Sequence, residues 1–355
     1  MIALFRVDAS RGIGNGHVAR CRAFAAVLKS RFSFGRVIFA CAEVSKAWKS
    51  ILEGEGIEVQ RISSRLAGPQ PWSLEDPDAD AQAIVELAHR EVGRCDWVVV
   101  DHYSLDRIWE DRVRDVARKV LAIDDLANRQ HSCDIVVDHN FDDRPTSRYA
   151  SLVPPFAKQL IGPSFAMLRP EFAVLRRHVR CRTGRIRNIV ILLGPADVHN
   201  VTGKTLEAIG AAGLDEVRVN VVLGGEHPHA ERIMELARSC GANLHRSVPS
   251  MADLFANADL AVGAAGVTTL ERICLRLPSL FTTVADNQLP VARALAAIAP
   301  ALWLGPAESV TVAAVTAKLR QLSDGMHPDL SMDRMPEVDG LGADRIASEM
   351  LAINP

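Results

Sequence analysis

Short apolar runs alternate along the chain with longer segments of helical periodicity, and this alternation restricts the possible folds more than any other feature of the sequence. Such runs are typical of buried parallel strands, and the amphipathic segments between them are typical of helical crossovers. The chain is therefore predicted to form α/β domains with parallel sheets. Predicted strands span residues 2–7, 37–42, 97–102, 120–124, 135–138 and 159–162, and then 188–193, 217–223, 243–246, 260–262 and 279–284.

An arginine-rich stretch separates these two series of strands. Seven arginines lie between Met167 and Arg187 without a strand-like run, which favours a connecting helix. We predict two Rossmann-like, doubly wound domains over residues 1–166 and 188–355, joined by a linker helix over residues 167–187. A last helix over 343–352 could pack back on the first domain. Other helices are predicted to begin near His17, Ser45, Asp78 and Leu105, and then near Thr202, Pro228, Met251, Thr268 and Leu289.

The composition argues against several classes of protein. Lys and Arg number 41 against 43 Asp and Glu, so the chain has no overall basic field for nucleic acid or an anionic membrane. Its seven cysteines contain no CxxC pair, which favours a reducing compartment over a disulfide framework. We expect neither a signal peptide nor a membrane span, because the start lacks a basic segment and no apolar stretch reaches about 20 residues. These features together predict a cytoplasmic protein, and nothing in them requires an oligomer.

The loop after the first predicted strand is the most informative segment. Three glycines alternate before His17, where the next helix is predicted to begin, and they allow close approach of the backbone to a ligand. We predict that His17 is a general base that activates water, and that the neighbouring Asp8 orients its imidazole. In the simpler interpretation, His17 only closes the turn before the helix.

The same loop also fits a dinucleotide-binding fingerprint. The spacing Gly14-x-Gly16-x-x-Ala19 matches it, and Glu43 would then bind the ribose. This interpretation is the weaker one, because His17 would crowd a pyrophosphate.

Polar side chains follow the later strands of the first half as well. Asp101, His102 and Tyr103 are expected to hydrogen-bond a sugar, since the carboxyl ends of parallel strands meet at one edge of a sheet. Asp124 and Asp125 come after the next strand, where either of them could instead cap a turn.

In the second half, a small-residue loop over residues 263–269 leads into a helix with two threonines in its first turn, which suits a diphosphate. Glu271 is expected to bind ribose hydroxyls, although Thr268-x-x-Glu271 also fits a capping box. Asp197 follows another strand as either a helix cap or a ligand contact. His227 and His229 lack cysteine or carboxylate partners at ligand spacing, so no metal site is predicted.

Several separated motifs, in order over nearly the whole chain, resemble the PseG-type UDP-sugar hydrolases of the pseudaminic acid pathway. The matching passages are Arg6-Val-Asp8-Ala-Ser10, Gly14-Asn-Gly16-His17, Asp101-His102-Tyr103-Ser-Leu-Asp106, Ile123-Asp124-Asp125-Leu126, Gly162-Pro-Ser-Phe-Ala-Met-Leu168-Arg169-Pro170-Glu171-Phe172, Thr269-Leu-Glu271-Arg272 and Asp339-Gly340-Leu341-Gly342-Ala343. This resemblance implies a GT-B-like fold, with two domains facing a cleft and the nucleotide on the C-terminal domain.

The resemblance also implies hydrolysis of UDP-2,4-diacetamido-2,4,6-trideoxy-β-L-altropyranose at the anomeric carbon, with inversion and without a metal or other cofactor. The free sugar would enter nonulosonate synthesis for flagellin or a surface polysaccharide. On this basis we assign His17 and Asp8 to catalysis. Substrate contacts are assigned to Arg6, Ser10, Gly14, Gly16, Asp101, His102, Tyr103 and Arg169. Nucleotide contacts are assigned to Gly194, Asp197, Gly266, Thr268, Thr269, Glu271, Asn287 and Gln288.

The chain departs from the family pattern at two points. Pro195-Ala196 stands where glycine and a small hydroxyl residue are common, and Val267 stands where serine is common, which puts the choice of sugar in doubt. Rival hypotheses are a GT-B glycosyltransferase with a UDP-sugar donor and a non-catalytic nucleotide-sugar binding protein.

Overall fold

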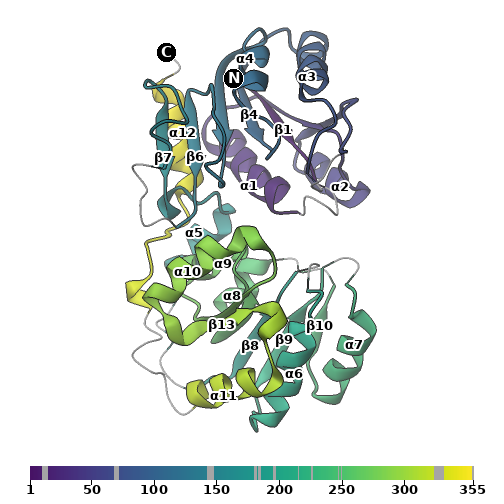
Figure 1. Ribbon diagram of the computed structural model, residues 1–355, viewed down its shortest axis with the longest axis vertical. Coiled ribbons are helices and arrows are strands. Elements are labelled where there is room, and N and C mark those ends of the chain that lie inside the picture. Colours follow the sequence, from purple (N-terminus) through teal and green to yellow (C-terminus); the bar gives the residue numbers. More distant parts are fainter. Residues whose placement is uncertain are drawn as a thin grey trace. The chain divides into compact units, whose positions relative to one another are not determined.

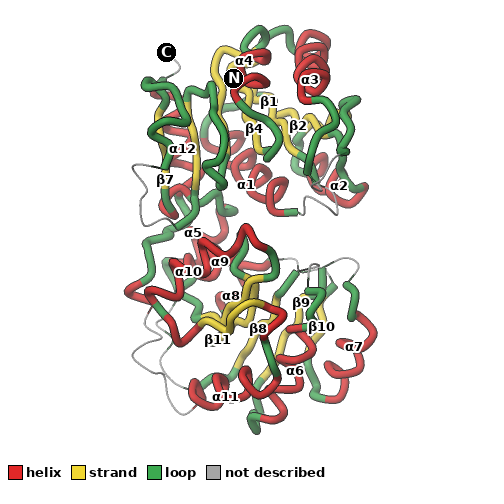
Figure 2. Tube along the Cα trace, viewed as in Figure 1, coloured by secondary structure: helices red, strands yellow, loops and turns green. Residues whose placement is uncertain are grey.

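The computed structural model describes residues 1–9, 15–67, 72–141, 148–179, 182, 185–194, 197–214, 216–224, 227–246, 248, 250–323 and 332–353, with only the backbone of 287, 301 and 333. The chain divides into two units. Unit 1 comprises Met1–Asn140, Arg144–Pro170 and Gly340–Pro355, and unit 2 comprises Phe141–Asp143 and Glu171–Asp339. Each unit is an α/β structure built on one parallel sheet, as the alternating pattern predicts (Figures 1 and 2).

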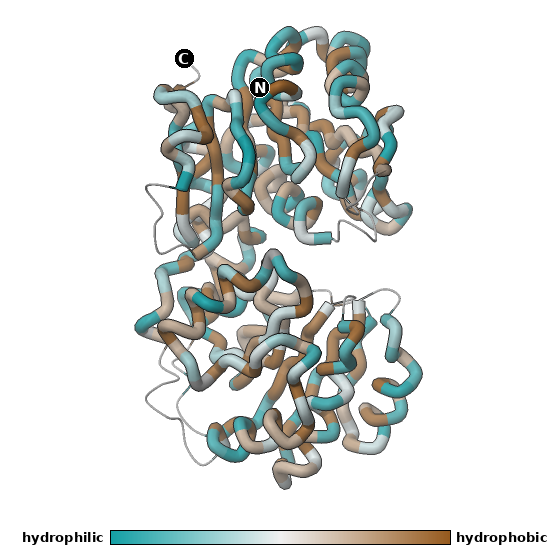
Figure 3. The backbone as a smooth tube through the Cα atoms, in the orientation of Figure 1, coloured by the Kyte–Doolittle hydropathy of each residue, from teal (hydrophilic) through white to brown (hydrophobic). Residues whose placement is uncertain are grey.

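The sheet of unit 1 has seven parallel strands in the order β3-β2-β1-β4-β5-β6-β7. The central strands are almost completely buried, which explains why they are continuous apolar runs rather than alternating ones. In Figure 3, hydrophobic segments follow the strands inside each unit. The strands are β1 (Ile2–Val7), β2 (Arg36–Cys41), β3 (Glu58–Arg61), β4 (Cys95–Asp101), β5 (Ala117–Ile123), β6 (Ile135–Asp138) and β7 (Lys158–Ile161).

Helices cover both faces of this sheet. Alternate residues of β1 belong to two separate apolar clusters: Phe5 packs in the cluster that contains residues of α1, α2 and α12, and Leu4 packs in the cluster that contains residues of α3 and α4. Unit 1 is thus doubly wound. Its helices are α1 (Gly16–Arg31), α2 (Lys46–Gly54), α3 (Pro77–Glu91), α4 (Arg107–Val113), the 3-10 helix η1 (Pro163–Phe165) and α12 (Gly342–Ala352).

The end of the chain returns to unit 1 through α12, which packs against α1 and η1. Gly342, its first residue, lies so close to the main chain that an added Cβ would be 2.4 Å from the oxygen and 2.5 Å from the nitrogen of Ala166. Both are backbone atoms, which cannot move aside as the end of a flexible side chain can. The fit therefore requires glycine.

Replacing Gly342 with alanine is expected to destabilise unit 1 by about 1–3 kcal/mol, because the added methyl group overpacks the junction of α12. Urea unfolding followed by circular dichroism measures the change. Gly54→Ala is the matched control, since its Cβ would meet nothing within 4 Å in a helical position. Equal midpoints for the two variants would contradict the prediction.

The sheet of unit 2 has six parallel strands in the order β10-β9-β8-β11-β12-β13. They are β8 (Asn188–Leu192), β9 (Arg218–Val222), β10 (Asn243–His245), β11 (Leu260–Ala264), β12 (Ser279–Thr283) and β13 (Trp303–Pro306). The helices are α5 (Pro170–Arg176), α6 (Val201–Ala211), α7 (Ala230–Ser239), α8 (Met251–Ala256), α9 (Thr268–Cys274), α10 (Leu289–Ile298) and α11 (Val312–Ser323), with 3-10 turns at η2 (Asp286–Gln288), η3 (Pro300–Leu302), η4 (Ala307–Ser309) and η6 (Met332–Arg334).

The predicted linker helix over residues 167–187 is wrong in its length, because only Pro170–Arg176 is helical in the described part of this stretch. Pro170 has no N–H for a helix interior and therefore starts the helix. Beyond it, Arg182 donates hydrogen bonds to the carbonyl oxygens of Phe255, Ala256 and Leu275, at the ends of α8 and α9. This arginine satisfies open helix ends of unit 2 and does not continue a helix of its own.

Among the described residues, no helix combines the length and the apolar character that crossing a bilayer requires. The six described cysteines are all free thiols, and five of them are buried.

Candidate active site

The predicted base lies at the point of unit 1 where the strand order reverses. The chain moves from β1 outward to β2 and β3, then returns to place β4 on the other side of β1. In such sheets the loops beyond the carboxyl ends of these two central strands diverge and leave room for a ligand. Val7 and Asp101 are paired at those ends, and His17 is the second residue of α1, which follows β1.

His17 forms a close pair with Asp101. Its Nδ1 is 2.6 Å from Oδ1 of Asp101, and only 7% of the imidazole is exposed. Because a carboxylate oxygen can only accept, we assign a hydrogen to Nδ1, which leaves Nε2 as the nitrogen that can take up a proton. This geometry suits a general base.

Arg20, one turn further along α1, holds the same carboxylate with two hydrogen bonds. Its Nε donates to Oδ2 of Asp101 over 2.7 Å, and Nη2 donates to Oδ1 over 2.6 Å. Its Nη1 donates to Oδ2 of Asp125 over 2.9 Å. The Tyr103 hydroxyl donates to this same Asp125 oxygen, and its ring meets the His17 ring edge to face with centroids 4.6 Å apart. Five side chains thus close a ring of contacts.

In this network of five side chains, neighbouring charges shift the pKa values of Asp101 and Arg20. Arg20 and then His17 hold the pKa of the buried Asp101 carboxyl far below its usual range, against the opposing effect of burial. The carboxylates of Asp101 and Asp125 raise the pKa of Arg20 in turn, although burial opposes this. The site therefore contains an ionised Asp101 and a permanently charged Arg20.

The expected pairing of Asp8 with His17 is wrong. Oδ1 of Asp8 accepts hydrogen bonds from the backbone N–H groups of Ala42 and Glu43, and Oδ2 accepts one from Arg6. Asp8 therefore joins the end of β1 to the end of β2. The carboxylate on His17 comes from β4, the other neighbour of β1.

Arg6 and His102, which were predicted to contact the substrate, are both buried. The Arg6 guanidinium is fully buried and binds Asp80 and Asp8, so it has no surface for a sugar. Burial lowers the pKa of His102 to about 3, and its Nδ1 accepts the N–H of Ser104. Asp101 has both oxygens engaged inside the protein. These three side chains therefore bind other groups of the protein and hold the framework of the site.

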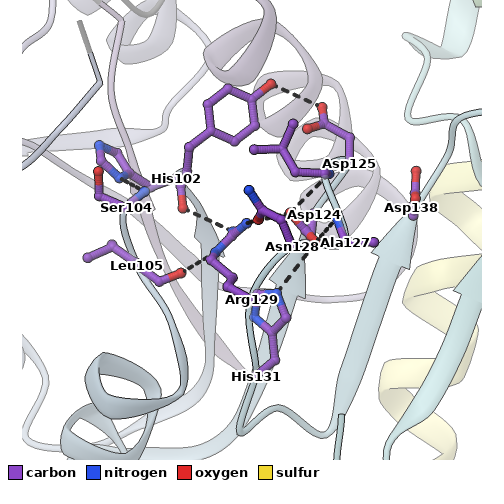
Figure 4. A network of polar contacts seen from close by, with 12 residues as sticks. His102, Ser104, Leu105, Asp124, Asp125, Ala127, Asn128, Arg129, His131 and Asp138 are labelled. Atoms are coloured by element: carbon purple, nitrogen blue, oxygen red, sulfur yellow. Dashed lines mark hydrogen bonds and ion pairs between the residues drawn. The ribbon is translucent and has the colours of Figure 1, made fainter. Parts of the chain in front are cut away.

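A second polar network lies beside the ring and fixes the loop that carries Asp125 (Figure 4). Arg129 donates to the carbonyl oxygens of His102 and Leu105 and to Oδ1 of Asp124. The Asp124 carboxylate also accepts from the N–H of Ala127. Asp124 is therefore the turn-capping carboxylate of the pair, and Asp125 is the one that faces Arg20.

Two buried groups of this network have shifted pKa values. Burial raises the pKa of Asp138 to about 6, despite the opposing charge of Arg148. The neighbouring carboxylates of Asp124, 3.6 Å away, and of Glu110, which is hydrogen-bonded to it, raise the pKa of His131 to about 9, although burial opposes them. The motifs include Asp124 and Asp125 but not Arg129 or His131, which hold this network together.

The structure describes three of the five other predicted site residues of unit 1 that follow. Ser10 and Gly14 lie outside the described residues. Gly16 is the first residue of α1, Tyr103 is partly exposed beside His17, and Arg169 is partly exposed just before α5.

Unit 2 repeats the reversal of strand order at β8 and β11, and the predicted loops follow these two strands. Gly194 has a positive φ of 78°, which suits glycine at this turn. Asp197 accepts hydrogen bonds from the N–H groups of Val201 and Thr202 through its two oxygens and is fully buried. Its carboxylate therefore caps open N–H groups at the start of α6, where Asn200 is the N-cap residue. Pro195 and Ala196 lie outside the described residues.

The loop after β11 is braced by Arg272. Its Nη2 donates to the carbonyl oxygen of Ala264 and to Oγ1 of Thr269, so this hydroxyl is occupied. Burial lowers the pKa of Arg272 to about 10. Gly263 makes room for it, since a Cβ there would be 2.5 Å from Nη1.

The remaining predicted nucleotide contacts surround this loop. Gly266 and Thr268 are partly exposed, and Nε2 of Gln288 is 3.5 Å from the position of a Cβ on Gly266. The helix α9 begins at Thr268 with Val267 as its N-cap, so the capping-box interpretation of Glu271 is wrong. Glu271 is partly exposed in the first turn. The side chain of Asn287 is not described.

No protein-family model matches the chain. Three curated proteins are similar to it. An uncharacterized protein of Methanocaldococcus jannaschii is 24% identical over 76% of this chain, and the spore coat polysaccharide biosynthesis protein SpsG of Bacillus subtilis is 26% identical over 53%. The matches span only 53% and 56% of those two relatives. The UDP-2,4-diacetamido-2,4,6-trideoxy-β-L-altropyranose hydrolase of Campylobacter jejuni is 23% identical over 67% of this chain and 75% of its own.

Solved structures match over almost the full length. MurG of Acinetobacter baumannii superposes with a TM-score of 0.60 at 16% identity, covering 99% of each chain. TcCGT1 in complex with UDP gives 0.65 at 9% identity, covering 100% of this chain and 99% of that one. The UDP-GlcNAc 2-epimerase of Neisseria meningitidis bound to UDP-GlcNAc gives 0.58 at 12% identity, covering 99% of each. The chain is thus a distant homologue of the C. jejuni hydrolase and of SpsG, and it has the GT-B fold.

Proposed function

We propose that this protein hydrolyses a UDP-linked diacetamido-trideoxyhexose at its anomeric carbon and releases UDP and the free sugar. The observation that carries the proposal is the His17–Asp101 pair at the strand reversal of unit 1. With Nδ1 bound to a carboxylate, the imidazole has its tautomer and orientation set before substrate arrives. A base of this kind is suited to removing a proton from a water molecule.

The proposed step is an inverting displacement. The oxygen of water forms a bond to the anomeric carbon, and the bond from that carbon to the β-phosphate oxygen breaks. Nε2 of His17 takes the water proton, and UDP leaves with the bonding electron pair. Tyr103, partly exposed and in contact with the His17 ring, is proposed to line the sugar side together with Gly16.

Unit 2 is proposed to hold the nucleotide. Its candidate surface consists of the loop after β11 and the turn before α10, where Gly266, Thr268 and Gln288 lie close together and partly exposed. Backbone N–H groups and hydroxyls of such a loop donate hydrogen bonds to a diphosphate. Glu271 is proposed to accept hydrogen bonds from the ribose.

The similarity to a named UDP-sugar hydrolase favours this substrate class. A glycosyltransferase is the second candidate, because MurG and TcCGT1 share the fold. In that case an acceptor hydroxyl replaces water, and UDP release requires the acceptor. Sugar made by the proposed hydrolase would serve a pseudaminic-acid-type nonulosonate for a surface polysaccharide or flagellin.

The first experiment incubates the full chain, in EDTA and without an acceptor, with UDP-2,4-diacetamido-2,4,6-trideoxy-β-L-altropyranose and with UDP-GlcNAc. NMR follows UDP and the anomeric configuration of the freed sugar. UDP release with inversion supports a hydrolase. UDP binding without release contradicts hydrolysis, and release only with an added acceptor identifies a transferase.

Glu271→Ala is expected to weaken UDP binding, measured by calorimetry, because the ribose loses a charged acceptor worth about 1.5–3 kcal/mol. Glu231→Ala is the matched control, since Glu231 is likewise an acid in the first turn of a unit 2 helix and is exposed. An unchanged dissociation constant in Glu271→Ala would remove this residue from the site.

A further inference from the structure

Arg20 was not among the residues that the sequence singled out, yet it binds two carboxylates beside His17, those of Asp101 and Asp125. Its side chain is 2% exposed, and its guanidinium binds Asp101 through Nε and Nη2 and Asp125 through Nη1. Nη2 is also 3.1 Å from Nδ1 of His17. Since Nδ1 donates to Asp101, this last contact places a positive charge beside an N–H group and is not a hydrogen bond.

This position has an electrostatic consequence. A buried carboxylate beside a histidine favours the imidazolium, which has already taken up its proton and cannot act as a base. A cation held against both the carboxylate and the ring opposes that effect. In a site shielded from water such a charge acts with little screening.

We propose that Arg20 is a positioning residue that keeps His17 in its neutral, proton-accepting form by neutralising Asp101. Its two parallel hydrogen bonds also hold the carboxylate in the orientation that His17 requires. The catalytic meaning of this role depends on the proposed function of His17, but the effect on its protonation does not.

Other charged and neutral groups also lie near His17. Asp125 adds a second negative charge on the far side of Arg20, and the Tyr103 ring packs on the imidazole. Cys21 donates its thiol to Asp101, and burial keeps its pKa well above the usual range, so it stays neutral. Burial also lowers the pKa of His102 to about 3 and that of His139 to about 4, so both are neutral near pH 7. Arg20 is therefore the only cation among these groups, all of which lie in the described part of unit 1.

The test is a histidine NMR titration of the full chain without substrate. Selective labelling of Cε1 gives one signal for each histidine, and the signal lost in His17→Gln identifies His17. We expect Arg20→Gln to move the His17 titration midpoint to higher pH by about one unit or more. Arg20→Lys keeps the charge and should return the midpoint toward the wild-type value. Arg22→Gln is the matched control on the same helix, since Arg22 pairs with Glu55 at the surface.

A second variant tests the proposal independently, in case Arg20→Gln does not fold. Asp125→Asn removes one of the two negative charges that Arg20 serves, so the His17 midpoint is expected to move to lower pH, opposite to Arg20→Gln. General damage to the fold does not produce opposite displacements. If both variants titrate like the wild type, or if Arg20→Gln does not fold and Asp125→Asn leaves the midpoint unchanged, the proposal is overturned.

Activity provides a separate readout. With a substrate that releases UDP, the acid limb of the pH–rate profile should move with the NMR midpoint in each variant. If the midpoints move but no sugar nucleotide is hydrolysed, the proposed function fails while the role of Arg20 stands. If hydrolysis occurs and the midpoints do not move, the role of Arg20 fails alone.

Discussion

Replacing His17 with alanine is expected to lower kcat for UDP release by about 10²–10⁴-fold, because a positioned general base contributes about that much. UDP affinity should be unchanged, since the nucleotide is proposed to bind unit 2. The fold should also persist, because Asp101 keeps its two hydrogen bonds from Arg20 when the imidazole is removed. Rapid-quench measurement of UDP release and calorimetry with UDP give the two quantities separately.

His89→Ala is the control for this variant, since His89 is an exposed histidine in the last turn of α3. It should leave kcat as in the wild type. Added imidazole should restore part of the rate in His17→Ala, because a small base can occupy the vacated space. Equal losses of UDP affinity and turnover would instead mean that His17 shapes the binding surface, and the assignment as a base would be abandoned.

The sequence predicted the fold well where strands are buried on both faces. Such strands must be continuous apolar runs, and β1 and β6 were located with the bounds that the structure gives them. The edge strands β7 and β10 were predicted to within one residue at each end, but the edge strands β3 and β13 were missed. Glu58–Arg61 has a single apolar residue, and glycine and proline end Trp303–Pro306, so neither segment contains a strand-like apolar run.

The sequence predicted the site only in part, because it shows which residues are near one another along the chain and not in space. His17 was found because glycines and a helix start stand next to it in the sequence. Its partner was misassigned, because nearness along the chain favoured Asp8 over Asp101. The structure pairs His17 with a residue 84 positions away, since β4 returns to lie beside β1. Contacts of this kind depend on strand order, which periodicity does not encode.

Burial was the other quantity that the motifs did not supply. Asp197 was open to interpretation as a cap or a ligand, and only its two backbone partners decide for the cap. Arg6 lies in a motif that points to a sugar, but its side chain faces the interior and binds Asp80. A residue of a functional motif can thus serve the site by holding its framework.

That framework leads to the largest expected effect on stability. Asp80, on α3, accepts hydrogen bonds from Nε and Nη2 of Arg6 at 3.0 and 2.7 Å and from Nε1 of Trp109 at 2.9 Å, all buried. Arg6 and its hydrogen bonds hold the pKa of Asp80 below the usual value against the effect of burial. The carboxylate is therefore charged, and removing it leaves a buried guanidinium whose one remaining ion-pair partner among the described residues is Asp8.

Asp80→Ala is accordingly expected to destabilise unit 1 by about 3–5 kcal/mol, because breaking a buried ion pair strands the remaining charge. Four of the five tryptophans, Trp48, Trp72, Trp97 and Trp109, lie in unit 1, so tryptophan fluorescence during urea unfolding reports mainly on this unit. Asp78→Ala is the control on the same helix, where an exposed carboxylate lies 3.6 Å from Arg112 and should contribute less than about 1 kcal/mol. The double variant Arg6→Met with Asp80→Leu should unfold at a higher urea concentration than Asp80→Ala, because neither charge is then left alone. If the double variant were the less stable of the two, the loss would come from packing, and the ion pair would not be what joins α3 to β1.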